Sequence, residues 1–257
     1  MKTTALRPLL AALALGGACL AAAAADTPQP GGATLVVGMA HLPPPHLPGA
    51  KVRTPDGVAI PVANALAERA GAQLQTVQVD AAGLAQPPAA HGARLTLASI
   101  VGDAPAEPGI QRIPTGYAAR PMAIMRSDTD IKSWRQLAGR TVCLVQGSAH
   151  VGTLAERHGA IEMLYKTPTD ALIGVRTGAC DATVHDDRML EELIKFPEWK
   201  KFSAALRGGP QRSVVAVVAA DDADTARLVK AAAKDWHAQG YFDALMRSTA
   251  RDLAFAA

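Results

Sequence analysis

The sequence predicts an α/β fold whose mostly parallel sheets are covered by helices on both faces. Short apolar segments rich in Val, Ile and Leu alternate with segments whose apolar residues recur at helical spacing. The first unit consists of a strand at residues 34–39, a helix at 62–70 that Gly71 ends, and a strand at 74–79. This order favours parallel strands joined by helices.

A second series of elements follows residues 80–92, a stretch rich in Ala, Pro and Gly with little periodicity. We expect strands at 94–99, 120–126, 141–145, 182–185 and 214–218, and helices at 131–137, 169–178 and 224–246, the last with one break near Gly240. One more helix is expected to begin at Ser148, whose hydroxyl is suited to cap it. Because ligands of such sheets bind at the carboxyl ends of the strands, we expect functional residues in the loops that follow the strands.

The N-terminal segment, residues 1–25, is typical of a secretory signal peptide. It combines a basic start, an apolar run made mostly of Ala and Leu, and small residues just before Asp26. We therefore expect cleavage after Ala25 and export to the periplasm. In that compartment Cys143 and Cys180 can form a disulfide, although two separate buried thiols explain them about as well.

The charge composition excludes two classes of partner. The chain has 26 Lys and Arg against 23 Asp and Glu, few aromatic residues and no basic run. A nearly neutral chain of this kind offers no electrostatic basis for binding nucleic acid or an anionic membrane. We expect a monomer that binds a small molecule and needs no cofactor.

Several segments in order resemble the periplasmic solute-binding proteins of polar amino acid ABC transporters, the family 3 type. Residues 131–150 (IKSWRQLAGRTVCLVQGSAH) are similar to that family's helix, glycine turn, strand and Gly-Ser loop. Residues 171–186 (ALIGVRTGACDATVHD) resemble its helix, turn and Asp-Ala-x-x-x-Asp strand, and LVVGMAHLPPP looks like its first strand and proline turn. The chain resembles a divergent member.

The resemblance implies a periplasmic binding protein type II fold, with two lobes of mostly parallel sheets and a cleft between them. Lobe one would comprise residues 26–118 plus 221–257, and lobe two residues 119–220. A small polar ligand would bind in the cleft and pass to the membrane subunits of an ABC importer.

The resemblance also assigns site residues. Gly147 and Ser148 would present unpaired backbone N–H groups to a ligand carboxylate. Asp186 would pair with a ligand ammonium group, which rejects ligands that lack this charge. Ser99, at the end of a strand, and His46, in the proline-rich turn, complete the predicted lobe-one contacts together with Glu107.

Glu107 marks a departure from the family. The family's Thr-Pro-x-Arg loop supplies an arginine for the ligand carboxylate, whereas Ala104 and Glu107 stand at the corresponding positions here. This change favours cationic or neutral ligands over an ordinary amino acid. The histidines of the same loops, His41, His46, His150 and His185, could hold a transition metal with Asp186 or Glu107. Their spacing matches no metal motif, so we expect no metal site.

Three functions follow from these observations. The first is a ligand receptor for an ABC importer, which the resemblance and the signal peptide favour. The second is a periplasmic accessory protein of an oxidase or dehydrogenase system, which the lost arginine favours. The third is an enzyme of the dehydratase type, but no nucleophile, base and orienting residue are arranged in a recognisable pattern, so we expect no catalysis.

Overall fold

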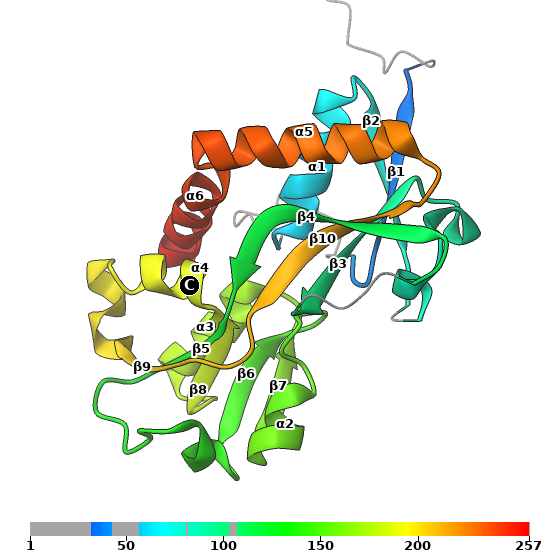
Figure 1. The fold of residues 1–257 in the computed structure, drawn as a ribbon. Helices are drawn as coiled ribbons and strands as arrows, with labels where there is room; N and C mark the ends of the chain where they lie inside the picture. Colours follow the sequence, from blue (N-terminus) through cyan, green and yellow to red (C-terminus); the bar gives the residue numbers. More distant parts are fainter. Residues whose placement is uncertain (1–31, 43–56, 81, 103–106, 257) are drawn as a thin grey trace, which may run out of the picture. The chain divides into compact units, whose positions relative to one another are not determined.

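The computed structural model describes residues 32–42, 57–80, 82–102 and 107–256, which form two five-stranded sheets (Figure 1). The first sheet has the strand order β2-β1-β3-β10-β4, and the second has the order β7-β6-β8-β5-β9. The strands of the first sheet are β1 (Thr34–Met39), β2 (Gln73–Gln78), β3 (Leu95–Val101), β4 (Ile110–Ala119) and β10 (Arg212–Ala219). Those of the second are β5 (Pro121–Met125), β6 (Thr141–Val145), β7 (Ile161–Tyr165), β8 (Ala182–Asp186) and β9 (Ala204–Arg207).

Both sheets combine a parallel centre with antiparallel strands on one side. In the first sheet β1 pairs in parallel with β2 and β3, and β10 is antiparallel to β3 and β4. In the second sheet β6 is parallel to β7 and β8, and β5 is antiparallel to β8 and β9. The predicted α/β class is confirmed.

Helices fill the connections between the strands. They are α1 (Ala59–Arg69), α2 (Thr153–His158), α3 (Pro168–Thr177), α4 (Asp187–Leu193), α5 (Ala223–Gln239) and α6 (Tyr241–Ala256), with 3₁₀ turns at Gly83–Ala85, Pro88–His91, Trp134–Leu137 and Pro197–Phe202. The expected break in the last helix occurs at Gly240, which ends α5 in a left-handed conformation. The helix expected at 131–137 is only a 3₁₀ turn. In the described residues no helix is long and apolar enough to span a bilayer.

The chain passes between the two sheets twice. It leaves the first sheet at Arg120, between β4 and β5, and returns through residues 208–211, between β9 and β10. We call Arg120 and residues 208–211 the crossing segments. Arg120 Nη1 donates a hydrogen bond of 2.7 Å to the Gly209 carbonyl, so the crossing segments are tied to each other.

Two elements differ from the predicted lobes. Residues 119–220 were assigned to lobe two, but β10 lies between β3 and β4 in the first sheet. Helix α6, assigned to lobe one, packs against α4, whereas α5 packs against α1 and β4 (Figure 1). An apolar strand pattern does not reveal which sheet accepts the strand, because both sheets offer the same kind of edge.

Strand β4 was not predicted, and its sequence explains why. Pro114 and Gly116 interrupt the alternation of apolar residues, and both residue types are rare inside strands. In the structure β4 is an edge strand, where the missing N–H of Pro114 removes no necessary ladder bond. A register shift in the pairing of β4 with β10, between Ser213 and Val215, accommodates the irregular segment.

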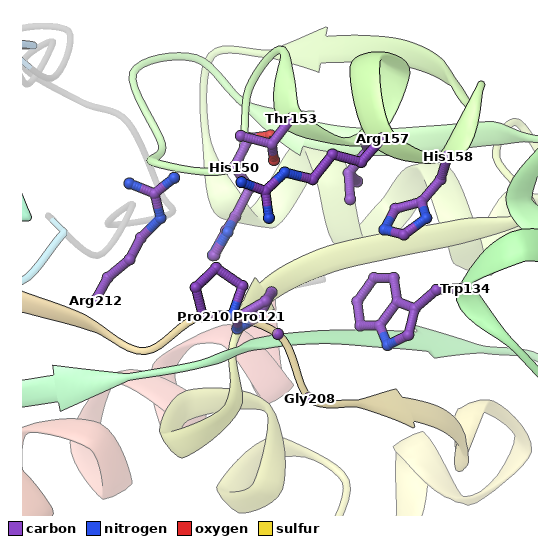
Figure 2. Close-up of a pocket in the computed structure, with 11 residues that line it drawn as sticks. Pro121, Trp134, His150, Thr153, Arg157, His158, Gly208, Pro210 and Arg212 are labelled. Atoms are coloured by element: carbon purple, nitrogen blue, oxygen red, sulfur yellow. The ribbon is translucent and has the colours of Figure 1, made fainter. Parts of the chain in front are cut away.

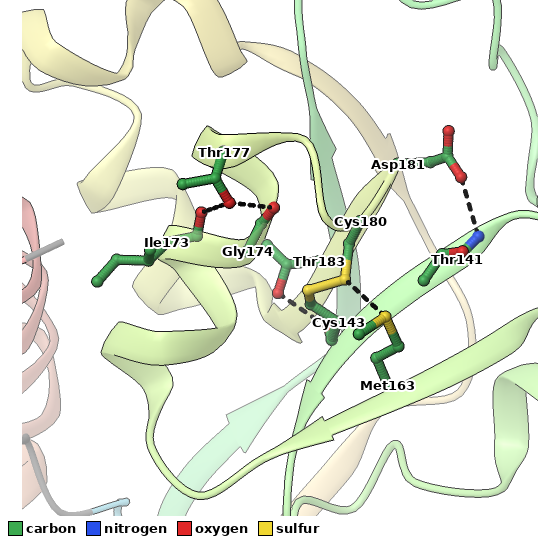
Figure 3. The surroundings of a disulfide bond; sticks show 9 residues. All are labelled: Thr141, Cys143, Met163, Ile173, Gly174, Thr177, Cys180, Asp181 and Thr183. Atoms are coloured by element: carbon green, nitrogen blue, oxygen red, sulfur yellow. Dashed lines mark hydrogen bonds between the residues drawn. A yellow bond between two sulfur atoms is a disulfide. The ribbon is translucent and has the colours of Figure 1, made fainter.

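A disulfide joins Cys143 in β6 to Cys180, just before β8 (Figure 3). Their Cα atoms are 5.7 Å apart, and both residues are buried in the core. The Thr183 hydroxyl donates to the Cys143 carbonyl at 3.0 Å, which adds a second link between the two neighbouring strands. Of the two alternatives left open by the sequence, the structure therefore has the paired one.

Removing this disulfide should destabilise the fold. The bond closes a loop with a sequence separation of 37 residues, and a loop of this size contributes about 2–4 kcal/mol by restricting the unfolded chain. Urea unfolding of the mature protein with and without dithiothreitol should show this loss of unfolding free energy. A double Cys143→Ala, Cys180→Ala variant is the control and should not respond to the reductant. An unchanged urea midpoint on reduction would contradict the expectation.

Candidate functional site

The loop after β6 does not lead directly into a helix. Helix α2 begins at Thr153, and its N-cap is Gly152 with φ of 80°, so the prediction that a helix begins at Ser148 is wrong. The Ser148 hydroxyl instead accepts a hydrogen bond of 3.4 Å from the His150 N–H. Because a left-handed glycine separates Ser148 from the helix, the serine cannot satisfy the helix's first N–H groups.

The start of α2 is occupied by a carboxylate of the protein itself. Glu162 in β7 accepts hydrogen bonds from the backbone N–H of Gly152 at 2.7 Å and from those of Leu154 and Ala155 at 3.0 Å. A negative group at this position satisfies unpaired N–H groups and favours the helix dipole. A carboxylate of the protein therefore occupies the start of α2, which lies beyond Gly147 and Ser148, the residues expected to meet a ligand carboxylate.

Asp186, at the end of β8, is also bonded within the protein. The Tyr117 hydroxyl donates to its Oδ2 atom at 2.8 Å, and His150 Nε2 lies 3.1 Å from its Oδ1 atom. Burial acts to raise the pKa of Asp186, but the hydrogen bonds from His150 and Tyr117 and the neighbouring imidazoles outweigh it and lower that pKa. An ionised carboxylate only accepts hydrogen bonds, so His150 Nε2 carries the proton. We call Asp186, Tyr117 and His150 the Asp186 network.

Tyr117 connects this network to the first sheet. It lies in β4 and is buried, with its ring centroid 5.4 Å from that of Phe242 and the Arg188 guanidinium 5.5 Å from the ring centre. Burial, followed by the charge of Asp186, raises the pKa of the phenol, so the hydroxyl remains a neutral donor. The bond from Tyr117 to Asp186 therefore links strand β4 of one sheet to strand β8 of the other.

A close contact covers the loop that carries Gly147. Gly147 has φ of 75°, and a Cβ atom placed on it would lie 2.1 Å from Cγ of His41. His41 lies two residues after the end of β1. Only glycine fits this combination of backbone conformation and contact. The imidazole of His41 thus lies directly against one of the two residues expected to bind a ligand carboxylate.

The remaining predicted residues do not join the Asp186 network. Ser99 in β3 is exposed and pairs in the ladder with Val214, and Glu107 is exposed ahead of β4. His46, Ala104 and the predicted signal peptide lie outside the described residues. Within the described ranges, no group of three or more His, Cys, Asp or Glu side chains could hold a metal ion. Ligand binding by Ser148, Asp186, Gly147, Ser99, Glu107 and His46 stays a prediction.

Comparison with known proteins addresses the fold. No protein-family profile matches the chain, and no curated protein is similar to it in sequence. Among solved structures, the substrate-binding protein of an amino acid ABC transporter is 20% identical with a TM-score of 0.57, over 84% of this chain and 98% of that one. AbpA from Streptococcus pneumoniae, solved with L-arginine, is 16% identical with a TM-score of 0.59, over 86% and 96%. The chain has the fold of these binding proteins.

The third example is an ancestral cationic amino acid solute-binding protein, AncCDT-1, with 18% identity and a TM-score of 0.58 over 84% of this chain and 94% of that one. A second structure of AncCDT-1 is described as that of a precursor of cyclohexadienyl dehydratase. The resemblance seen in the sequence is thus confirmed for the binding-protein fold.

Sequence reasoning missed the internal partners of the site. Tyr117 is 69 positions from Asp186, Glu162 is 10 positions from Gly152, and neither Tyr117 nor Glu162 belongs to a motif. The available signal was a tyrosine close to the predicted lobe boundary, where a phenol needs a partner once it is buried. Glu162 gives no such signal, because an acidic residue is usually solvated.

The imidazole of His185, the residue before Asp186 in the chain, should make the free energy of unfolding depend on pH. Burial lowers the pKa of His185 to about 4, against the opposing charge of Asp186, and its buried Nε2 atom has no hydrogen-bond partner among the described residues. The folded state therefore keeps this ring neutral, whereas the unfolded chain takes up a proton near pH 6.5. The free energy of unfolding should fall by up to about 3 kcal/mol between pH 6.5 and 4.

Chemical denaturation across this pH range measures the effect. A His185→Gln variant removes the titrating ring and should show a flatter dependence, and His237→Gln, on α5, serves as a matched control that keeps His185. Equal slopes for the His185→Gln variant and the unaltered protein would show that His185 does not cause the dependence.

Proposed function

We propose that this protein is a secreted solute-binding protein whose ligand is not a free α-amino acid. The observation that carries the proposal is the hydrogen bonding of Asp186, which has the binding-protein position at the end of β8 but already has Tyr117 and His150 as partners. The basic, apolar N-terminal segment supports secretion to the periplasm.

An α-amino acid needs one group for its carboxylate and one for its ammonium. Three features of this chain oppose such a ligand. The ring of His41 lies against Gly147, and Asp186 already has Tyr117 and His150 as partners. Glu107 has the sequence position of the family's arginine. Displacing the donors to Asp186 would leave the buried Tyr117 hydroxyl and His150 imidazole without partners, which costs about 1–3 kcal/mol for each group. A ligand of a different charge pattern avoids this cost.

Delivery to an ABC importer is part of the proposal. The structural neighbours with this fold are described as substrate-binding proteins of such transporters, and α/β proteins of two lobes can report a bound ligand by hinge motion. We propose no catalytic role, since Tyr117 and His150 already engage the Asp186 carboxylate.

A periplasmic accessory role, exercised through contact with a partner protein, is the second candidate. The position of His41 favours it, because a ring packed against Gly147 covers part of the loop expected to meet a ligand. A receptor should retain or bind a small solute, whereas an accessory protein should carry a partner chain instead.

Ligand tests distinguish these readings. None of the twenty standard amino acids should raise the melting temperature of the mature protein, because their two charges find no open partners. A true ligand at a hundred times its Kd adds about 2.7 kcal/mol to the free energy of unfolding. In a protein of this size, each kcal/mol raises the melting temperature by roughly 2–4 °C. Stabilisation by arginine or another standard amino acid would overturn the exclusion.

Native mass spectrometry of protein taken from the periplasm without refolding provides the complementary measurement. A retained small molecule other than an amino acid supports the receptor proposal. A retained partner chain with no small molecule supports the accessory role and contradicts the receptor.

A further inference from the structure

A cavity of about 190 Å³ lies beside the crossing segments (Figure 2). Pro121 and Gly208 to Pro210 form one wall, and His150 of the Asp186 network also lines it. The hydrogen bond from Arg120 to the Gly209 carbonyl fixes this wall, and a Cβ atom on Gly209 would lie only 2.6 Å from Pro121 Cγ. On this side the cavity is therefore bounded by Gly209 packed closely against the Pro121 ring.

The charges of the cavity are all of one sign. Arg157 of α2 and Arg212, the first residue of β10, line it, and no Asp or Glu does. Among the described residues neither arginine has an ion-pair partner, whereas carboxylates pair with Arg69, Arg94, Arg126, Arg140, Arg188, Arg207 and Arg227. Two guanidinium groups facing a cavity without a counter-charge favour an anionic ligand, and their fork of N–H donors suits a carboxylate.

An aromatic wall lies at the other end of the cavity. The rings of Trp134 and His158 are stacked, with centroids 5.7 Å apart and planes 26° from parallel, and Figure 2 shows them on the side away from Arg212. Trp134 Nε1 donates to the Arg207 carbonyl at 3.2 Å, which fixes the orientation of the indole. A flat apolar ring can lie against such a fixed aromatic face.

The volume limits the size of the ligand. Sites for drug-sized molecules measure roughly 300–1,000 Å³, so a cavity of about 190 Å³ suits one ring with a short polar group. Arg157 lies in α2, which connects β6 and β7 of the second sheet, and Arg212 lies in β10 of the first sheet. A ligand held by both would bridge these two parts of the chain next to the crossing segments.

We propose that this cavity binds a monocyclic aromatic carboxylate, with the carboxylate between Arg157 and Arg212 and the ring against Trp134 and His158. The inference rests on the proposed function and names the class of solute. It also agrees with the exclusion of α-amino acids, because an ammonium group placed between two guanidinium groups would be repelled.

Calorimetric titration of the mature protein with benzoate tests the site. Benzoate should bind with one molecule per chain, and the neutral analogue benzamide should bind at least tenfold more weakly. Arg157→Gln and Arg212→Gln should each weaken benzoate binding about tenfold or more, since each removes a charge-assisted hydrogen bond. Arg135→Gln is the matched control, because this exposed arginine neighbours Trp134 in sequence without lining the cavity, and it should leave the Kd unchanged.

Two outcomes of these titrations would overturn the inference. Inorganic phosphate that binds as tightly as benzoate would mark a general anion site and exclude the aromatic contact. Benzoate affinity that is insensitive to both arginine substitutions would place the ligand elsewhere.

The failure of the inference differs from the failure of the proposed function. If benzoate gives no heat while native mass spectrometry finds another retained solute, the inference fails and the receptor proposal stands. If a partner chain is retained and no solute binds, both fail.

Discussion

The hydrogen bond between the Tyr117 hydroxyl and the Asp186 carboxylate is the interaction on which the rest of the candidate site depends. Tyr117 lies in β4, the last strand before the chain leaves the first sheet, and Asp186 ends β8 of the second sheet. A buried phenol requires an acceptor, and a half-buried carboxylate requires donors. Each group meets the need of the other, and His150 completes the set from the loop before α2.

This arrangement gives the Asp186 carboxylate partners within the protein. Tyr117 and His150 lie at hydrogen-bond distance from Asp186, and Glu162 accepts hydrogen bonds from backbone N–H groups at the start of α2. The chain thus has the fold of the binding proteins it resembles, with these polar groups bonded internally. Positive charge without a partner among the described residues remains at Arg157 and Arg212, in a cavity that also includes His150.

Local sequence patterns predicted the parts of this structure that depend on neighbouring residues. The apolar run at 141–145 coincides with β6, and Asp186 lies at a strand end, as the alternation of strands and helices required. Strand β4 escaped prediction because Pro114 and Gly116 break its pattern, and only its edge position makes them acceptable. The cap expected at Ser148 failed because Gly152, four residues later, adopts the left-handed conformation that sets the start of α2.

The partners of Asp186 depend on contacts between residues that are far apart in sequence. Tyr117 and Asp186 are separated by 69 positions, and no spacing rule connects them. The disulfide was left open for the same reason, since pairing depends on the distance between β6 and the turn before β8.

A double-mutant cycle on Tyr117 and Asp186 tests the central claim most directly. The free energy of unfolding is measured for the unaltered protein, Tyr117→Phe, Asp186→Ala and the double variant. If the two side chains support each other as the structure indicates, the losses should be non-additive, with a coupling energy of about 1–2 kcal/mol. Losses that add to within about 0.3–0.5 kcal/mol would contradict the account and leave Asp186 available to a ligand.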